Sequence, residues 1–253
     1  MKLLLTIISS FFLSLIWSDA NAQDYNQYIQ KGLEFEKVKN EKAALLQYRK
    51  AQELKPTDLT ALYKCSELFC RIGARESDHQ IRDNHYKSGL AFATMAFKYH
   101  PKTDDACVAM SIALGRIALT KSGKEKVTAV REIKSFAENA ITINPLNFKA
   151  WHIIGKWNYE VSNLNFIEKA AIRIIYGGLP DASFSKAISA YEKANELNPN
   201  FGLNYLELAK AYEKEGKKDN AITTLKKVLL LPDYNEDDPI VKKQAGSMLL
   251  RLE

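Results

Sequence analysis

The feature that most constrains the fold of this chain is a pattern of large and small residues that recurs at fixed spacing. Over residues 25–58 the pattern is carried by Tyr28, Gly32, Phe35, Ala44, Tyr48, Ala51 and Pro56. Lys31 is the one mismatch, because that position is usually apolar. Small residues at these offsets let two antiparallel helices approach closely, and the proline ends the second helix. The spacing therefore predicts a helical hairpin.

The same pattern returns near the end of the chain. Over residues 202–232 it consists of Tyr205, Leu208, Ala209, Tyr212, Gly216, Ala221, Leu225 and Val228, with Pro232 about one residue early. Three more units lie between, and their second helices are expected to end at Pro101, Pro145 and Pro199. The proline spacings from Pro56 onward are 45, 44, 54 and 33 residues. Since the usual period is about 34 residues, helices or loops should be extended in the middle units.

This pattern resembles that of the tetratricopeptide repeat (TPR). A TPR hairpin cannot bury its apolar face alone, so successive hairpins stack into a curved solenoid. We therefore expect an all-α, TPR-like α-solenoid of about five helical hairpins, with long middle repeats and a C-terminal capping helix. Asp238-Pro239 should begin the capping helix, because aspartate suits the N-cap and proline the first helical position.

The fourth unit contains about twenty extra residues, judged against the repeat period. Its apolar residues recur at helical spacing, and they are Leu164, Ile167, Ala171, Ile174 and Ile175. Gly177-Gly178-Leu179-Pro180 ends the run, and Asp181 or Ser183 should cap the helix that follows. We predict an extra amphipathic helix, whose five apolar residues are candidates for lining an apolar pocket.

A second, narrower resemblance includes this insert. The segment GKWNYEVSNLNFIEKAA, followed by IRIIYGGLPDASFSKAISAYEKANELNPNF, resembles the regulator-of-microtubule-dynamics family. The similarity covers roughly residues 130–250 and includes a Gly-x-Trp segment, a Gly-x-Pro turn and an Ala-rich second helix. It implies a helical repeat domain used for association, and a related tethering protein uses such a domain for lipids. It implies no catalytic residue, because Gly155, Trp157 and Leu164 look like packing residues.

The first residues have the features of an export signal. Lys2 precedes an apolar run over residues 3–17, and Ala20-Asn21-Ala22 forms a small-residue cleavage site. We therefore expect a signal peptide over 1–22 and a repeat domain over 23–253, with an uncleaved anchor as the alternative. The predicted location is exported, either periplasmic or secreted and possibly envelope-associated. For that reason microtubule binding is not carried over from the family.

Composition and motifs give little sign of chemistry. The net charge of +6 comes from 36 basic and 30 acidic residues spread along the chain, which is not the footprint of a nucleic-acid-binding protein. His79, His85, His100 and His152 form no HExxH motif, and no Walker loop, GxSxG elbow or dinucleotide fingerprint occurs. The pairs Asp104-Asp105 and Asp237-Asp238 lie at expected helix starts, where carboxylates cap. No catalytic residue, metal site or cofactor is expected.

The three cysteines, Cys65, Cys70 and Cys107, are an odd number, which excludes complete internal pairing. Cys65 and Cys70 should lie about 140° apart around one helix and so should not bond each other. Either could approach Cys107 in the next repeat. Buried free thiols are the favoured interpretation, and a disulfide is the alternative.

The inner surface of the stack is the expected binding surface, because the first helices of a solenoid present an extended concave face. Its candidate residues are Tyr63, Glu67, His152, Lys156, Tyr159 and Lys210. Lys156, Tyr159 and Lys210 could hold an acidic peptide, and ordinary solvated surface charge is the alternative. The Lys-and-Asn clamp of chaperone-binding TPR proteins is not reproduced at these offsets.

Taken together, these patterns predict a non-catalytic scaffold that binds a protein or peptide partner. The alternative is a lipid-binding or lipid-transfer module that uses an apolar pocket near the inserted helix. The identity of the partner and the oligomeric state are left open by the residues.

Overall fold

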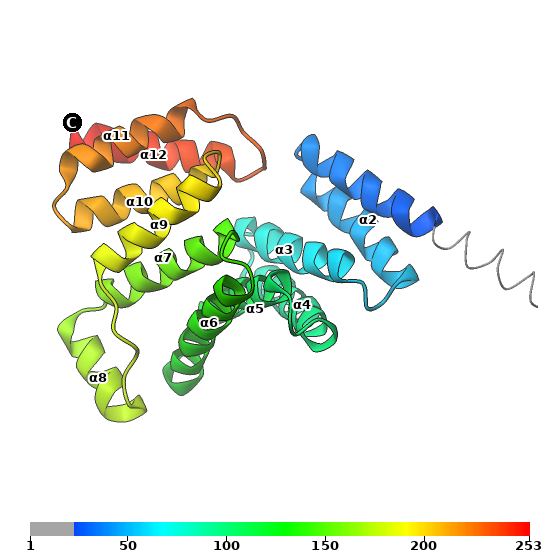
Figure 1. Ribbon diagram of the computed structural model, residues 1–253, viewed down its shortest axis with the longest axis horizontal. Coiled ribbons are helices and arrows are strands. Elements are labelled where there is room, and N and C mark those ends of the chain that lie inside the picture. The colour runs from blue at the N-terminus through cyan, green and yellow to red at the C-terminus, as the bar shows by residue number, and fades with distance from the viewer. Residues whose placement is uncertain (1–22) are drawn as a thin grey trace, which may run out of the picture.

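The computed structural model describes residues 23–253, and this part of the chain is a stack of helices joined by short turns (Figure 1). It begins with helical backbone over residues 23–37. The helices that follow are α2 (Glu41–Leu54), α3 (Leu59–Arg75), α4 (His79–Tyr99), α5 (Asp104–Ala118), α6 (Gly123–Ile143), α7 (Phe148–Asn163), α8 (Phe166–Tyr176), α9 (Phe184–Leu197), α10 (Gly202–Lys214), α11 (Lys218–Leu230) and α12 (Asp238–Leu252). No strand occurs within residues 23–253.

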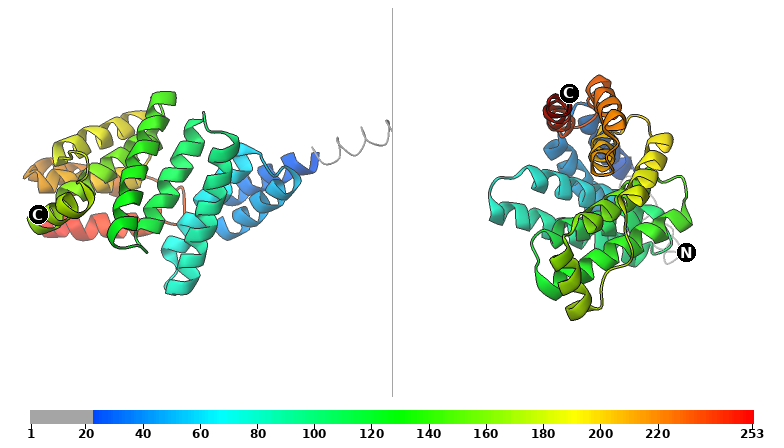
Figure 2. Two further views of the ribbon diagram at one scale, coloured as in Figure 1. Left: turned by 90° about the horizontal axis from the view of Figure 1, so that it is seen from below. Right: turned by 90° about the vertical axis from the view of Figure 1, so that its left-hand side faces the viewer.

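The helices form five hairpins in chain order. The first hairpin joins residues 23–37 to α2, and the others are α3 with α4, α5 with α6, α7 with α9, and α10 with α11. The first helices of successive hairpins contact one another, α3 with α5, α5 with α7, and α7 with α10, and so build the inner face of the curved stack (Figures 1 and 2). Helix α12 packs on α10 and α11 as a cap. The predicted all-α, TPR-like solenoid is confirmed.

The prolines end the second helices as expected. In the five hairpins of residues 23–253 the second helix stops two residues before a proline, namely Pro56, Pro101, Pro145, Pro199 and Pro232. The middle repeats are long because α4 and α6 have 21 residues each, whereas α2 has 14 and α11 has 13. In the second and third repeats the extension therefore lies in the helices and not in the loops, whereas the fourth is extended by α8 and the segment that joins it to α9. Ser183 rather than Asp181 caps α9, where its side chain accepts the N–H of Lys186.

Two glycines let a helix pack closely against a tyrosine of the other helix in its hairpin. A Cβ at Gly32 would lie 2.6 Å from the ring of Tyr48, and a Cβ at Gly155 would lie 2.5 Å from the ring of Tyr191. Both tyrosines are fully buried. The small residue and the aromatic of the repeat pattern therefore act as one packing pair in the first and fourth hairpins, because only glycine leaves room for the ring.

The start of α12 differs from the prediction by one residue. Asp237 is at the N-cap position and Asp238 is the first residue of the helix, but the Asp237 side chain makes no cap hydrogen bond. That carboxylate instead contacts Arg71 and Arg75 of α3. The contact could not be seen in the local pattern, because the partners are more than 160 residues away.

All three cysteines are free and buried, so the alternative of a disulfide to Cys107 is not formed. Cys70 lies where α4 crosses α3, and a Cβ at Gly89 would approach its sulfur to 2.6 Å. Burial raises the pKa of Cys65 to about 12, despite the opposing charge of Arg49. These thiols therefore behave as small apolar side chains.

Candidate functional site

Polar side chains on the inner helices form a chain of contacts that begins at α3 and α7. The ammonium group of Lys149 donates to the hydroxyl of Tyr63 and to Oε1 of Glu67, both at 2.6 Å. This brings together two predicted groove residues and ties α7 to α3 across the intervening α5. Sequence analysis missed Lys149, although it lies three and seven residues before His152 and Lys156 and so shares their face of α7.

The Lys149–Glu67 pair is ionised and largely removed from solvent. The side chain of Glu67 is 12% exposed and that of Lys149 is 28% exposed. Burial alone would raise the pKa of Glu67, but the charges of Lys149, Lys64 and Arg71 outweigh this effect and lower the pKa to about 2. The pKa of Lys149 is lowered by burial and raised more strongly by Glu67, so its net direction is upward. The pair therefore acts as a structural tie between the second and fourth hairpins.

The second part of the inner face lies between α7 and α10, and we call it the α7–α10 groove, formed by Lys156, Tyr159, Glu207 and Lys210. Oε2 of Glu207 accepts from Lys156 and Oε1 accepts from Lys210, each at 2.7 Å. Burial raises the pKa of Glu207, but the two ammonium groups lower it overall. The buried carboxylate of Glu207 thus forms ion pairs with both ammonium groups. The side chain of Lys156 is still 42% exposed and that of Lys210 is 31% exposed.

Tyr159 completes the α7–α10 groove. Its ring centroid lies 5.7 Å from the ammonium nitrogen of Lys156, and its ring packs edge-on against Phe184 at 5.6 Å. An aromatic face beside an ammonium group holds the cation by attraction to the ring as well as by ion pairing. The structure therefore brings three of the predicted residues, Lys156, Tyr159 and Lys210, into one cluster around Glu207, a residue that sequence analysis did not single out.

His152 belongs to the framework below the groove. Its Nδ1 lies 2.8 Å from Oδ1 of Asn204, whose amide nitrogen donates to the carbonyl of Tyr191 and to Asn195. Because the Asn204 oxygen is an acceptor, the proton resides on Nδ1 of His152. Burial lowers the pKa of His152, although the bond to Asn204 opposes this. The imidazole is therefore neutral and joins α7 to α10.

The position four residues after the close-packed glycine is charged in the first hairpin and uncharged in the fourth. In the first hairpin the hydroxyl of Tyr48 donates to Glu36, which follows Gly32 by four residues and also pairs with Lys64. In the fourth hairpin the residue four positions after Gly155 is Tyr159. The buried hydroxyl of Tyr191 consequently finds no hydrogen-bond partner within the described part of the chain. The α7–α10 groove thus has no carboxylate at the position that Glu36 occupies in the first hairpin.

Helix α8 is the predicted extra helix, and it projects from the body of the stack (Figure 1). A capping box starts it, because the Asn165 side chain accepts the N–H of Glu168 while the Glu168 carboxylate accepts the N–H of Asn165. Gly177 ends it in the left-handed region at a φ of 76°. Arg131 of α6 donates to the carbonyls of Tyr176 and Gly178 and holds this end against the stack.

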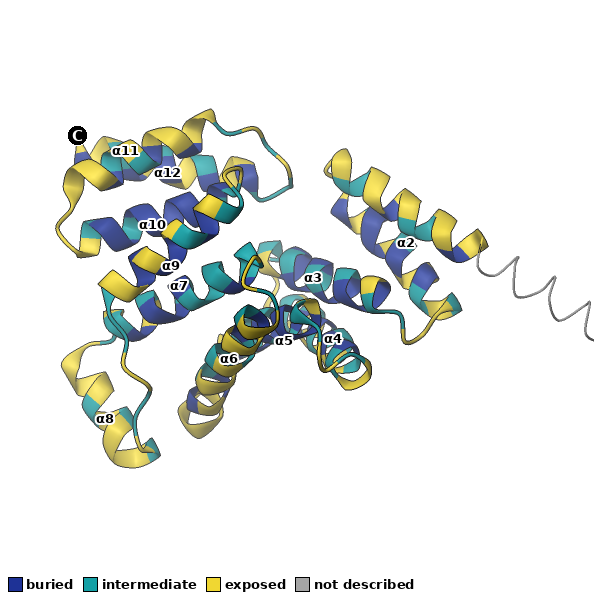
Figure 3. Cartoon of the chain, in the orientation of Figure 1, coloured by how far each residue is buried: buried dark blue, intermediate teal, exposed yellow. Residues whose placement is uncertain are grey.

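The expectation that the apolar residues of α8 line a pocket is wrong. Ile167 is 77% exposed, Ile174 is 84% exposed and Ile175 is 64% exposed, and Ala171 is also exposed. Leu164, just before the helix, is half-buried. Figure 3 shows that most of α8 faces solvent. These side chains enclose no apolar cavity, so the lipid-transfer alternative loses the feature that motivated it.

Because α8 is exposed, truncating one of its side chains should hardly change the stability of the protein. Shortening Ile174 to valine should leave the free energy of unfolding within about 0.5 kcal/mol of the unmodified protein, because no packed contact is lost. The matched change Ile188→Val on α9, where the side chain is buried, should cost about 1 kcal/mol. Urea denaturation of both variants checks this. An equal loss in the two would mean that α8 is packed and not exposed.

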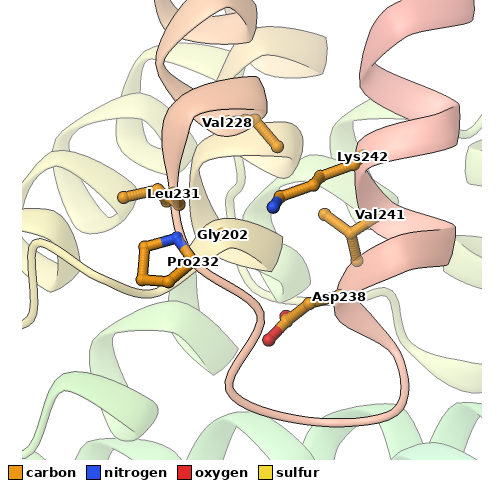
Figure 4. A pocket seen from close by; sticks show the side chains of 7 residues that line it. All are labelled: Gly202, Val228, Leu231, Pro232, Asp238, Val241 and Lys242. Atoms are coloured by element: carbon orange, nitrogen blue, oxygen red, sulfur yellow. The ribbon is translucent and has the colours of Figure 1, made fainter.

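A small cavity and an open depression lie in the described part of the chain. The cavity between α10, α11 and α12 measures about 10 Å³ and is lined by residues such as Val228, Asp238 and Val241 (Figure 4). A space of this size holds about one water molecule. An open depression of about 350 Å³ lies at the turn between α5 and α6, beside Leu114 and Ala129. Neither lies in the α7–α10 groove, which is an open surface.

Two further features bear on the kind of site. Within residues 23–253, no three His, Cys, Asp or Glu side chains are grouped so that they could hold a metal ion. No helix of the same region has the length and hydropathy needed to cross a membrane.

Comparison with known proteins identifies a family. Residues 27–253 match the family described as regulator of microtubule dynamics protein 1–3. Regulator of microtubule dynamics protein 1 of Rattus norvegicus is 25% identical over 196 residues, which cover 77% of this chain and 59% of the relative. The Bos taurus protein of the same name is 26% identical over 152 residues, covering 58% of this chain and 48% of the relative. The chain thus spans about half the length of these relatives.

A solved structure of similar fold comes from Thermus thermophilus, where a thermophilic TPR protein aligns with a TM-score of 0.67 at 16% identity. The alignment covers 89% of this chain and 99% of that one, which shows a shared fold. The resemblance predicted from the Gly-x-Trp segment is confirmed, and it extends well beyond residues 130–250.

The comparisons contradict the predicted location of the protein. The relatives are animal proteins named as regulators of microtubule dynamics, and such proteins are not periplasmic. The expectation of an exported protein, periplasmic or secreted, is therefore contradicted. The predicted signal peptide over 1–22 lies outside the residues that the structure describes.

Proposed function

The chain belongs to the regulator of microtubule dynamics protein 1–3 family, and from that membership we propose that it is a non-catalytic scaffold whose α7–α10 groove binds an acidic segment of a partner protein. Its TPR-like helical-repeat fold is that of a protein-binding scaffold.

The observation that carries the proposal is the shared carboxylate of Glu207. Lys156 and Lys210 both pair with this one group, and Lys156 has a second partner only in Glu160, whose side chain is 57% exposed. An exposed i,i+4 pair of this kind contributes little, because water screens it. Two ammonium groups therefore retain hydrogen-bonding capacity toward a ligand, since each carries three donors.

The position of Tyr159 supports the same ligand chemistry. Where the first hairpin has Glu36, the fourth has this uncharged ring, so the groove has one acid fewer to repel an anionic ligand than a hairpin with glutamate at that position would have. A tyrosine at the edge of a groove also offers a large, rigid contact surface at low entropic cost. An extended peptide with glutamate or aspartate side chains fits a surface of this kind better than a compact small molecule does.

We expect the double variant Lys156→Gln/Lys210→Gln to bind an acidic peptide at least about tenfold more weakly than the unmodified protein, a loss of about 1.4 kcal/mol. The probe is a short fluorescein-labelled peptide of alternating Glu and Ser residues, measured by fluorescence anisotropy. The matching peptide with Gln in place of Glu should bind weakly to both proteins. Binding of the acidic peptide should also weaken as salt is added.

The control is Lys193→Gln/Lys226→Gln, which removes two exposed cations from the outer helices α9 and α11. It makes the same change in net charge and should leave binding within about twofold of the unmodified protein. The proposal fails if both double variants weaken binding equally, because the peptide would then respond to overall charge alone. It also fails if the Gln peptide binds as tightly as the Glu peptide.

A further inference from the structure

An acidic stretch near the end of the chain is seated on the first hairpins. Residues 231–237, here called the bridging segment, join α11 to α12 and extend toward the start of α2 (Figure 1). Oε1 of Glu236 accepts the backbone N–H of Glu41 at 2.7 Å. Oδ1 of Asp237 accepts from Arg75 at 2.6 Å, and Oδ2 accepts from Arg71 at 3.4 Å. The two ends of the solenoid are thereby joined through ion pairs and hydrogen bonds.

The surface that receives the bridging segment has an excess of positive charge. Arg71 and Arg75 lie one turn apart on α3, and both also contact Glu41, whose side chain is only 2% exposed. A second carboxylate, Glu236, lies 3.1 Å from Arg75. Outside the bridging segment the two guanidinium groups form ion pairs with one carboxylate, Glu41, so both keep N–H donors for further carboxylates when the bridging segment is absent. Arginine forks of this kind are well suited to binding carboxylates.

The bridging segment is held in shape from its own side. Oδ2 of Asp238 accepts the N–H groups of Tyr234 and Asn235 at 2.7 and 3.0 Å, and Lys242 pairs with Asp233 at 2.7 Å. Figure 4 shows Asp238 and Lys242 facing the small space between α11 and α12. These bonds form a turn that directs Glu236 and Asp237 toward α3. The turn lies almost entirely within residues 233–238, so a peptide that contains them retains most of its elements.

We propose that Arg71 and Arg75 form a docking site for acidic protein segments, and that the bridging segment occupies it as an internal ligand. A partner with an acidic segment must displace Glu236 and Asp237 before it reaches α3. Displacement frees the C-terminal hairpin and cap from the first hairpins, so that the two ends of the solenoid can separate. This site is separate from the α7–α10 groove, and the proposal does not depend on ligand binding there.

The first test uses the peptide of residues 231–239, LPDYNEDDP, as the probe. The double variant Glu236→Gln/Asp237→Asn removes the internal competitor at two partly exposed positions. We expect the labelled peptide to bind this variant at least about tenfold more tightly than it binds the unmodified protein. Adding Arg75→Gln to the double variant should abolish the gain, whereas adding Arg49→Gln, an exposed arginine on α2, should preserve it. Equal binding to the double variant and the unmodified protein overturns the proposal.

The second test measures the opening itself. Spin labels at Val38→Cys and Leu230→Cys, both exposed positions, report the separation of the two ends by pulsed electron resonance. We expect a narrow distance distribution in the otherwise unmodified chain and a broader one, extended to longer distances, with Glu236→Gln/Asp237→Asn. An unchanged distance distribution overturns the proposal that the bridging segment holds the two ends of the solenoid together. When Lys156→Gln/Lys210→Gln is added to both proteins, the tighter peptide binding caused by Glu236→Gln/Asp237→Asn and the change in distance distribution should both persist, which separates this result from the function proposed for the α7–α10 groove.

Discussion

Replacing Gly155 with alanine is expected to lower the free energy of unfolding by about 2–3 kcal/mol, although alanine is the better helix former. The new Cβ would lie 2.5 Å from the ring of Tyr191. Real Cβ contacts are not this short, and the ring cannot move aside because Tyr191 is fully buried. Helix α7 and helix α9 would have to separate, which would disturb the hairpin that carries the α7–α10 groove. Urea denaturation measures the loss.

The matched control is Gly115→Ala in α5. No atom lies within 4 Å of a Cβ built there, so the variant should gain about 0.5–1 kcal/mol from helix propensity alone. The two substitutions are chemically identical and should have opposite signs. If Gly155→Ala were as stable as the unmodified protein, the ring of Tyr191 would not be packed against α7, and the close glycine–tyrosine pair would be disproved.

The glycine–tyrosine pair also shows why much of the fold could be predicted from sequence. A hairpin is a local structure, and its requirements fall within one repeat period. Gly32 with Tyr48, and Pro56 after α2, are therefore visible as spacing. The insert was predictable for the same reason, because Ile167, Ala171 and Ile174 repeat at helical spacing.

The direction in which α8 presents those residues was not predictable. Helical periodicity marks an apolar face but does not say what covers it. The pattern predicts a pocket lining, whereas Ile167 and Ile174 point to solvent because Arg131 holds only the end of α8 against α6. A contact that anchors one end of a helix leaves no signal in the spacing of its apolar residues.

Contacts between distant hairpins also could not be predicted from the sequence. Lys149 reaches Glu67 across one complete repeat, and Asp237 reaches Arg71 across 166 residues. These pairs depend on the curvature of the whole stack, which accumulates from small rotations between hairpins. Single-sequence spacing identifies Glu67 as an inward residue but cannot name its partner. The electrostatics of the inner face are therefore a property of the assembled solenoid.

Neutralising Glu67 should remove a large part of the stability of the protein at pH 7 and should change its dependence on pH. The folded pKa of Glu67 is about 2 and its ordinary value is 4.5. A carboxyl group with a depressed folded pKa stabilises the fold above its unfolded pKa and loses that contribution as the pH falls toward the folded pKa. The stabilisation is on the order of 3 kcal/mol at pH 7, and about 2 kcal/mol of it should be lost by pH 3.

The variant Glu67→Gln has no carboxyl group to titrate and leaves Lys149 without its ionic partner. We therefore expect its deficit against the unmodified protein to narrow by about 2 kcal/mol between pH 7 and pH 3, as followed by urea denaturation. Glu138→Gln is the control, because Glu138 is 54% exposed and pairs with Lys134 on the surface of α6. Its effect should stay within about 0.5 kcal/mol at both pH values. A Glu67→Gln deficit that does not depend on pH would mean that the Lys149–Glu67 contact does not tie α7 to α3 through charge.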